Sequence, residues 1–143
     1  MKSLIIIATF SLLVLSSITS CNKNQDRAFY PTLDVYINIS LPQYNTLQVP
    51  GGWAYVTGGL KGILVYAKGG NEFAAYDRNC TYNEANSCGI AEVNADNILV
   101  DCLCDGSQYN IFDGAVNNSP ATLPLKGYQT SFNSGNNTLR IFN

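Results

Sequence analysis

Apolar and polar residues alternate in short runs along most of this chain, which is the two-residue period of half-buried β-strands. Val35, Ile37 and Ile39, for example, alternate with Tyr36 and Asn38. Further short β-type runs, some alternating and some continuously apolar, predict strands at residues 53–57, 63–67, 72–76, 97–100, 108–112, 128–132 and 138–142. No segment keeps a helical period over three turns, so the fold is expected to be all-β.

Segments rich in glycine and asparagine separate these runs and predict tight turns. Lys68-Gly69-Gly70-Asn71 predicts one hairpin, and Ser134-Gly135-Asn136-Asn137 predicts another between the last two strands. Short strands joined by such turns indicate an antiparallel sandwich or small barrel. The chain has 143 residues and no internal repeat, so we expect a single domain at residues 33–143.

The N-terminus has the pattern of an export signal. Met1-Lys2 is basic, residues 4–15 are apolar, and small polar residues lead from Ser16 to Cys21. Because a membrane-spanning helix needs about 20 apolar residues, residues 1–20 are interpreted as a signal peptide. The residues before Cys21 resemble a bacterial lipobox, which predicts lipidation of Cys21 and a polar tether at residues 21–32. An ordinary signal peptide followed by an incidental cysteine is the alternative.

Lipidation and export together predict a location and two kinds of partner. The expected location is the bacterial cell envelope, with the protein lipid-anchored on the periplasmic or outer-membrane face. The expected partners are the membrane, through the lipid, and an envelope protein. A net charge of −2 argues against nucleic acid. In an exported protein, the four cysteines after Cys21 are expected to form disulfides.

Composition excludes several kinds of active site. The chain has five cysteines and no histidine. It therefore has no Ser-His-Asp triad, no imidazole base and no histidine ligand for zinc. No nucleophile motif or phosphate-binding loop is present either, so we predict no catalytic residue and no metal site. The acidic residues near the cysteines are interpreted as a solvated rim: Asp77, Glu84, Glu92, Asp96 and Asp101.

The cysteines occur in two motifs, each after a predicted strand. Phe73-Ala74-Ala75-Tyr76-Asp77-Arg78-Asn79 leads into Cys80-Thr81-Tyr82, and the second motif is Cys102-Leu103-Cys104-Asp105-Gly106-Ser107. Later segments follow in the order Asp113-Gly114-Ala115-Val116, Pro120-Ala121 and Pro124-Leu125. From about Gly51 onward this arrangement resembles a Rieske iron–sulfur domain, in which two cysteines and two histidines hold a 2Fe–2S cluster. The resemblance implies a small antiparallel β-domain with both cysteine loops at one tip.

Both histidine positions of the family are substituted. Tyr82 and Asp105 stand where the resemblance implies histidine, so the cluster-equivalent positions are Cys80, Tyr82, Cys102 and Asp105. Tyrosine and aspartate offer hard oxygen donors in place of imidazole nitrogen, so we predict no cofactor. The resemblance implies instead two disulfides, Cys80–Cys102 and Cys88–Cys104, although four cysteines permit three pairings.

The favoured hypothesis is a membrane-anchored envelope lipoprotein with a degenerate Rieske-like domain that serves as a non-catalytic structural or interaction module. One alternative is an electron-transfer protein that binds a 2Fe–2S cluster, or a single metal, through the four cluster-equivalent residues. A second alternative is thiol–disulfide exchange by Cys102-Leu103-Cys104. Asp101 and Asp105 argue against exchange, because carboxylates beside a thiol oppose formation of the reactive thiolate.

Overall fold

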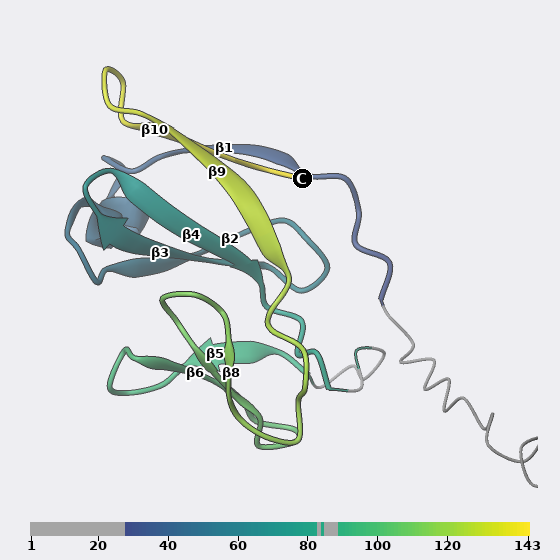
Figure 1. Cartoon of the computed structure of the whole chain (residues 1–143). Helices are drawn as coiled ribbons and strands as arrows, with labels where there is room; N and C mark the ends of the chain where they lie inside the picture. The colour runs from purple at the N-terminus through teal and green to yellow at the C-terminus, as the bar shows by residue number, and fades with distance from the viewer. Residues whose placement is uncertain (1–27, 83, 85–88) are drawn as a thin grey trace, which may run out of the picture.

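The computed structural model describes residues 28–82, 84 and 89–143, in which ten strands form two antiparallel sheets (Figure 1). The larger sheet has the strand order β1-β10-β9-β4-β3-β2. Its strands are β1 (Asp34–Asn38), β2 (Trp53–Val56), β3 (Ile63–Gly69), β4 (Glu72–Asp77), β9 (Gly127–Asn133) and β10 (Thr138–Phe142). The smaller sheet consists of β5 (Ala91–Val93), β6 (Leu99–Cys102), β7 (Gln108–Asn110) and β8 (Val116–Asn118), in that order. The all-β prediction is confirmed.

The two predicted hairpins are present. Strands β3 and β4 pair antiparallel and are joined through Gly70 and Asn71, and Asn71 has a φ of 67°. Strands β9 and β10 pair from Asn133 and Thr138, and Asn137 in their turn has a φ of 54°. Asparagine and glycine tolerate this left-handed conformation, which explains why the turns were recognisable in the sequence.

Three elements differ from the sequence prediction. A 3₁₀ helix, η1 (Pro42–Gln48), lies where no helix was expected; it has proline in its first turn and buries Leu47. Strands β5 and β8 were also not predicted. A seven-residue 3₁₀ helix and three-residue strands are too short to show a hydrophobic period, so the long-range contacts of the fold define them.

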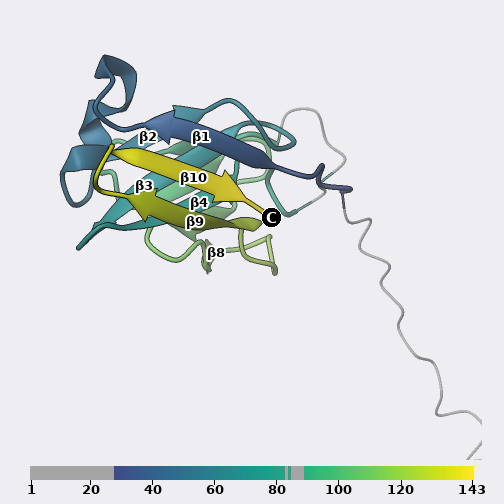
Figure 2. The ribbon, with the colours of Figure 1, turned by 90° about the horizontal axis from the view of Figure 1, so that it is seen from above.

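The molecule has two apolar cores, and β3 lies between them. Ile63 and Val65 point into the core of the larger sheet, together with Leu139 and Ile141 of β10. Leu64, between Ile63 and Val65 in β3, points into the second core, which lies between the larger and the smaller sheet. Figure 1 shows the smaller sheet below the larger one, and Figure 2 shows it behind the larger sheet when seen from above. Because both faces of β3 are covered, its residues form a continuous apolar run.

Residues 1–27 lie outside the described part of the chain, so the signal peptide, the lipidation of Cys21 and the domain boundaries remain predictions. In the part that the structure describes, no helix has the length and apolarity to cross a membrane.

Candidate functional site

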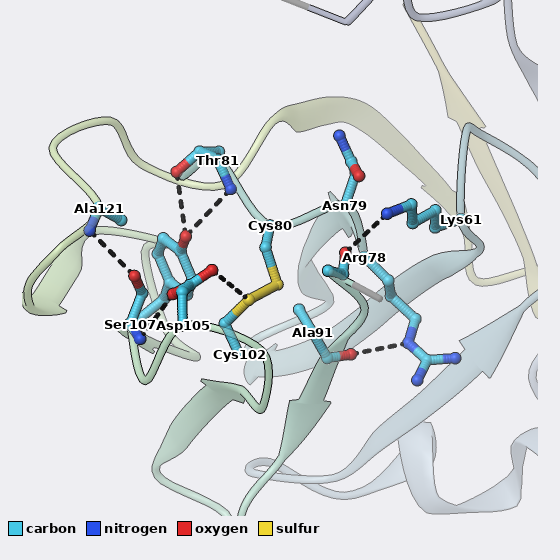
Figure 3. Close-up of a disulfide and its surroundings, with 12 residues drawn as sticks. Lys61, Arg78, Asn79, Cys80, Thr81, Ala91, Cys102, Asp105, Ser107 and Ala121 are labelled. Carbon is cyan, nitrogen blue, oxygen red and sulfur yellow. Dashed lines mark hydrogen bonds between the residues drawn. A yellow bond between two sulfur atoms is a disulfide. The ribbon is translucent and has the colours of Figure 1, made fainter. Parts of the chain in front are cut away.

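A disulfide joins the two cysteine loops at one tip of the molecule (Figure 3). Cys80 follows the end of β4, and Cys102 is the last residue of β6. The Cα atoms of the two residues lie 6.1 Å apart, and each residue is only 1% exposed. The structure thus contains the Cys80–Cys102 pairing that the family resemblance implies, buried in the second core.

Asp105 is the third cluster-equivalent residue at this place, next to the two cysteines of the disulfide. Its Oδ2 atom lies 3.1 Å from Sγ of Cys102. Because a disulfide sulfur carries no hydrogen, this approach is a van der Waals contact and not a hydrogen bond. The other carboxylate oxygen, Oδ1, accepts a hydrogen bond from the backbone N–H of Ser107 at 2.8 Å. One oxygen of Asp105 therefore orients the carboxylate, and the other faces the sulfur atoms.

The remaining predicted positions are placed differently. Tyr82 leaves 44% of its surface exposed, so its assignment to a cluster-equivalent position remains a prediction. Cys104 is exposed and is also disulfide-bonded. Cys88 lies outside the described residues, so the Cys88–Cys104 pairing remains a prediction.

A buried hydrogen-bond network next to the disulfide was not recognised as a feature of the sequence. Tyr109 is fully buried, and its hydroxyl accepts a hydrogen bond from the backbone N–H of Thr81 at 3.1 Å. The same hydroxyl lies 3.0 Å from Oγ1 of Thr81, and this Oγ1 donates to the carbonyl of Leu123. The network thus joins the first cysteine loop, β7 and the proline-containing segment. The alternation in β7, which turns Tyr109 inward between two half-buried polar residues, was the available signal.

Ser107 makes a second connection of this kind. It is fully buried, and its Oγ accepts a hydrogen bond from the backbone N–H of Ala121 at 2.9 Å. Its carbonyl accepts a hydrogen bond from the N–H of Cys102 at 2.8 Å, which closes the second cysteine loop. The proline-containing segment therefore lies beside both cysteine loops, through Ala121 and Leu123.

Two basic side chains at the ends of strands of the larger sheet, Lys61 before β3 and Arg78 after β4, reach the segment that leads into the smaller sheet. Lys61 Nζ donates to the carbonyl of Gly89 at 3.1 Å, and Arg78 Nε donates to the carbonyl of Ala91 at 2.9 Å. The guanidinium of Arg78 also stacks on the Tyr55 ring, 3.7 Å from its centroid. Figure 3 shows Lys61 and Arg78 on the side of the disulfide away from Asp105.

The interpretation of five acidic residues as one solvated rim is wrong for two of them. Asp77 is fully buried, and its carboxylate accepts hydrogen bonds from the N–H of Leu60 at 2.6 Å and the hydroxyl of Tyr128 at 2.7 Å. Glu84 is 9% exposed and accepts a hydrogen bond from the backbone N–H of Ala28. Burial and the Asp77 carboxylate both raise the pKa of Tyr128, so Tyr128 keeps the proton that it donates. Glu92 and Asp96 are exposed, as expected for a rim.

The chemistry available at this tip is that of sulfur and carboxylate. Among the described residues, Cys80, Cys102 and Asp105 place their Sγ and carboxylate oxygen atoms within 4.8 Å of one another. While the disulfide is closed, its sulfur atoms carry no negative charge and are poor metal ligands, because the thiolate is the form of cysteine that binds metal. The closed disulfide therefore cross-links the two cysteine loops and leaves no thiolate at Cys80 or Cys102.

Comparison with known proteins gives one family and several structures. The family model of the Rieske [2Fe-2S] domain matches residues 41–129. The plasma membrane Rieske protein PetC3 from Synechocystis PCC 6803 superimposes with a TM-score of 0.52 at 21% identity, covering 64% of this chain and 86% of that one. The ferredoxin of carbazole 1,9a-dioxygenase from Nocardioides aromaticivorans IC177 gives a TM-score of 0.45 at 17% identity, covering 68% of this chain and 91% of the ferredoxin. No curated protein matches the chain.

The family match covers more than half of the chain and includes both cysteine loops and the proline-containing segment. The similarity to PetC3 independently supports the same fold. The two-sheet architecture, the order of the motifs and the loops joined at one tip agree with both findings. The chain belongs to the Rieske [2Fe-2S] domain family.

Proposed function

We propose that this protein is an envelope lipoprotein whose Rieske domain lacks the standard cluster and serves as a non-catalytic structural or interaction module. The observation that carries the proposal is the Cys80–Cys102 disulfide. A Rieske cluster needs two cysteine thiolates on one iron and two imidazoles on the other. Here a covalent bond joins the two sulfur atoms, and the chain has no histidine. The residues at this tip therefore do not fit a standard Rieske cluster.

The disulfide offers the structural contribution that a cluster would otherwise make. It joins residues 22 positions apart, and the chain-entropy relation gives about 3 kcal/mol of stabilisation for a loop of this size. The hydrogen bonds of Tyr109 and Ser107 add order to the same loops. Leu103 is 74% exposed and Tyr82 is 44% exposed, so each cysteine loop presents one large side chain to solvent.

Metal analysis of the protein, purified without added reductant, tests the proposal. We expect no iron, no acid-labile sulfide and no visible absorption band. We also expect no free thiol among Cys80, Cys88, Cys102 and Cys104 when the unreduced protein is unfolded in the presence of a thiol reagent. About two irons and two sulfides per chain would overturn the proposal and favour electron transfer through altered ligands.

The membrane anchor is a separate part of the proposal. If Cys21 is lipidated, the mature protein should be found with membranes and should carry the mass of its acyl chains. The Cys21→Ala variant should lose that mass and leave the membrane fraction. A wild-type protein whose N-terminus bears no lipid would contradict the anchor but leave the assignment of the domain unchanged.

A further inference from the structure

We propose that reduction of the Cys80–Cys102 disulfide converts the tip into a site for one thiolate-binding divalent cation such as Zn²⁺, with Cys80, Cys102 and Asp105 as its ligands. The proposal rests on the proposed function, because the sulfur atoms must not already hold a cluster. It goes beyond that function by assigning a second, redox-dependent state to the same residues.

The donor atoms are already close to the arrangement that zinc needs. The two Sγ atoms and the Asp105 oxygen lie within 4.8 Å of one another. Around a tetrahedral zinc with Zn–S distances near 2.3 Å, two sulfur ligands are about 3.8 Å apart. After the S–S bond is broken, the sulfur atoms need to separate by a side-chain adjustment only. Cysteine thiolates and carboxylates are both zinc ligands, and three protein ligands leave the fourth tetrahedral position for water.

Asp105 is held in the orientation that a metal ligand requires. Ser107 donates its backbone N–H to Oδ1 of Asp105, which leaves Oδ2 directed at Cys102 (Figure 3). In metal sites, hydrogen-bond partners of this kind orient the side chains that bind the metal directly and raise the affinity for the metal. Asp105 is partly exposed, whereas Cys80 and Cys102 are each 1% exposed, so Asp105 is the ligand with direct access to solvent.

Local charge also favours a cation. Residues 79–125 contain six acidic residues and no lysine or arginine. Lys61 and Arg78 approach from the larger sheet, but they donate to the carbonyls of Gly89 and Ala91, away from Asp105. In the described residues of this segment, no cationic side chain competes for the Asp105 carboxylate.

The reductant is an external dithiol, or a phosphine that becomes the phosphine oxide while water supplies the oxygen atom and the two protons. A dithiol gives two electrons and two protons to the disulfide, so that Cys80 and Cys102 become thiols and the dithiol becomes a disulfide. Zn²⁺ then binds both sulfur atoms as thiolates and releases two protons, while Asp105 binds as the carboxylate that it already is.

The test compares zinc binding by the oxidised and the reduced full-length protein. The protein is reduced with a phosphine, freed of the phosphine without oxygen, and titrated with Zn²⁺ against a chromophoric chelator. We expect the reduced protein to bind one additional Zn²⁺ relative to the oxidised protein. With Co²⁺ in place of Zn²⁺, we expect a sulfur-to-cobalt charge-transfer band. No gain in affinity on reduction would overturn the proposal.

Three variants locate the site. Asp105→Asn keeps an oxygen for the Ser107 N–H, so it should fold, and we expect its zinc affinity after reduction to fall at least about tenfold. Asp101→Asn is the matched control, because the Asp101 carboxylate is bound by the Gln108 side chain at 3.0 Å; it should bind zinc like wild type. The double variant Cys88→Ser/Cys104→Ser should retain zinc. If Asp105→Asn binds zinc as tightly as wild type, or if the double variant loses zinc, the assigned ligands are wrong.

The two proposals fail in different ways. Iron and sulfide in the protein as isolated would overturn the proposed function, and with it the premise of the zinc site. A protein free of iron that gains no zinc on reduction would overturn only the zinc site.

Discussion

The two sheets of this molecule are stabilised by different means. The core of the larger sheet consists almost entirely of aliphatic residues on strands of four to seven residues. The smaller sheet has strands of three or four residues, and its core includes a disulfide and the buried hydroxyl of Tyr109. Short strands bury little area, so covalent and polar links to neighbouring loops replace part of the apolar contribution. The disulfide and the Tyr109 hydroxyl therefore contribute to the smaller sheet and its loops rather than to the outer strands of the larger sheet.

The two sheets also differ in the charge of their surrounding residues. The sequence from residue 79 to residue 125 carries no lysine or arginine, whereas Lys61, Arg78 and Lys126 lie on both sides of it in the chain. Arg78 approaches Glu92 at 3.8 Å and donates to the carbonyl of Ala91, so part of the positive charge of the larger sheet is used to hold the smaller one. The segment that contains the smaller sheet is therefore acidic, whereas the residues that border it in the chain are basic.

The largest effect should come from the aliphatic core. Leu139 is fully buried in β10, and Leu139→Ala should lower the free energy of unfolding by about 3–4 kcal/mol, because it removes apolar contacts and leaves a cavity. Leu103→Ala makes the same change at a side chain that is 74% exposed and should have an effect below about 0.5 kcal/mol. Denaturant unfolding of both variants measures the difference. Equal effects would show that the two leucines do not differ in burial as described.

Removing the disulfide should have the next largest effect and should be local. The double variant Cys80→Ala/Cys102→Ala should lose about 3 kcal/mol of stability. Amide hydrogen exchange should show the greatest loss of protection in β5–β7, with β3 and β10 less affected. A uniform loss across both sheets would contradict the division of the molecule into an aliphatic and a cross-linked region.

Substitution of Arg78, which joins the two sheets, should lower the stability of the protein more than substitution of Arg140. Arg78→Gln removes a hydrogen bond to Ala91 and the stacking on Tyr55, and should cost about 1–2 kcal/mol. Arg140→Gln is the matched control, since Arg140 pairs with Asp34 on the exposed surface of the larger sheet. Its effect on thermal unfolding should be the smaller of the two and should diminish in high salt. A larger effect of Arg140→Gln than of Arg78→Gln would contradict the assignment of Arg78 as a link between the two sheets.

The smallest effect at neutral pH should come from Tyr76→Phe. The Tyr76 hydroxyl donates to the carbonyl of Phe112 at 3.0 Å, a bond worth about 1 kcal/mol. Burial, followed by the nearby Asp113 carboxylate, raises the pKa of Tyr76, so the native state keeps a proton that the unfolded chain releases near pH 10.

The sign of the pH dependence follows from this difference. Above about pH 10 the unfolded chain binds fewer protons than the native protein, so stability should be complete below this pH and should fall as the pH rises further. Tyr76→Phe should make the fall less steep, whereas Tyr36→Phe, at a side chain that is 60% exposed, should not. Unfolding free energies measured from about pH 8 to about pH 11 test this. An equally steep fall in Tyr76→Phe and wild type would contradict the assignment to Tyr76.

Much of the fold could be predicted because its signals are local. The alternation of Val35, Ile37 and Ile39 marks β1, and the Gly70-Asn71 turn marks the β3–β4 hairpin. The motifs around Cys80 and Cys102 identified the family by their order and chemistry. The absence of histidine from the chain, read from composition alone, removed the usual ligands of a Rieske cluster.

Only the tertiary structure decided what surrounds the two sulfur atoms. It turned Asp105 Oδ2 toward Cys102, exposed Tyr82, and buried Asp77, which the sequence had suggested was part of a solvated rim. It also paired Thr81 with Tyr109 across 28 positions of sequence. The physical reason is range: hydrophobic period and turn chemistry act over a few neighbouring residues, whereas burial and side-chain orientation depend on how distant strands pack.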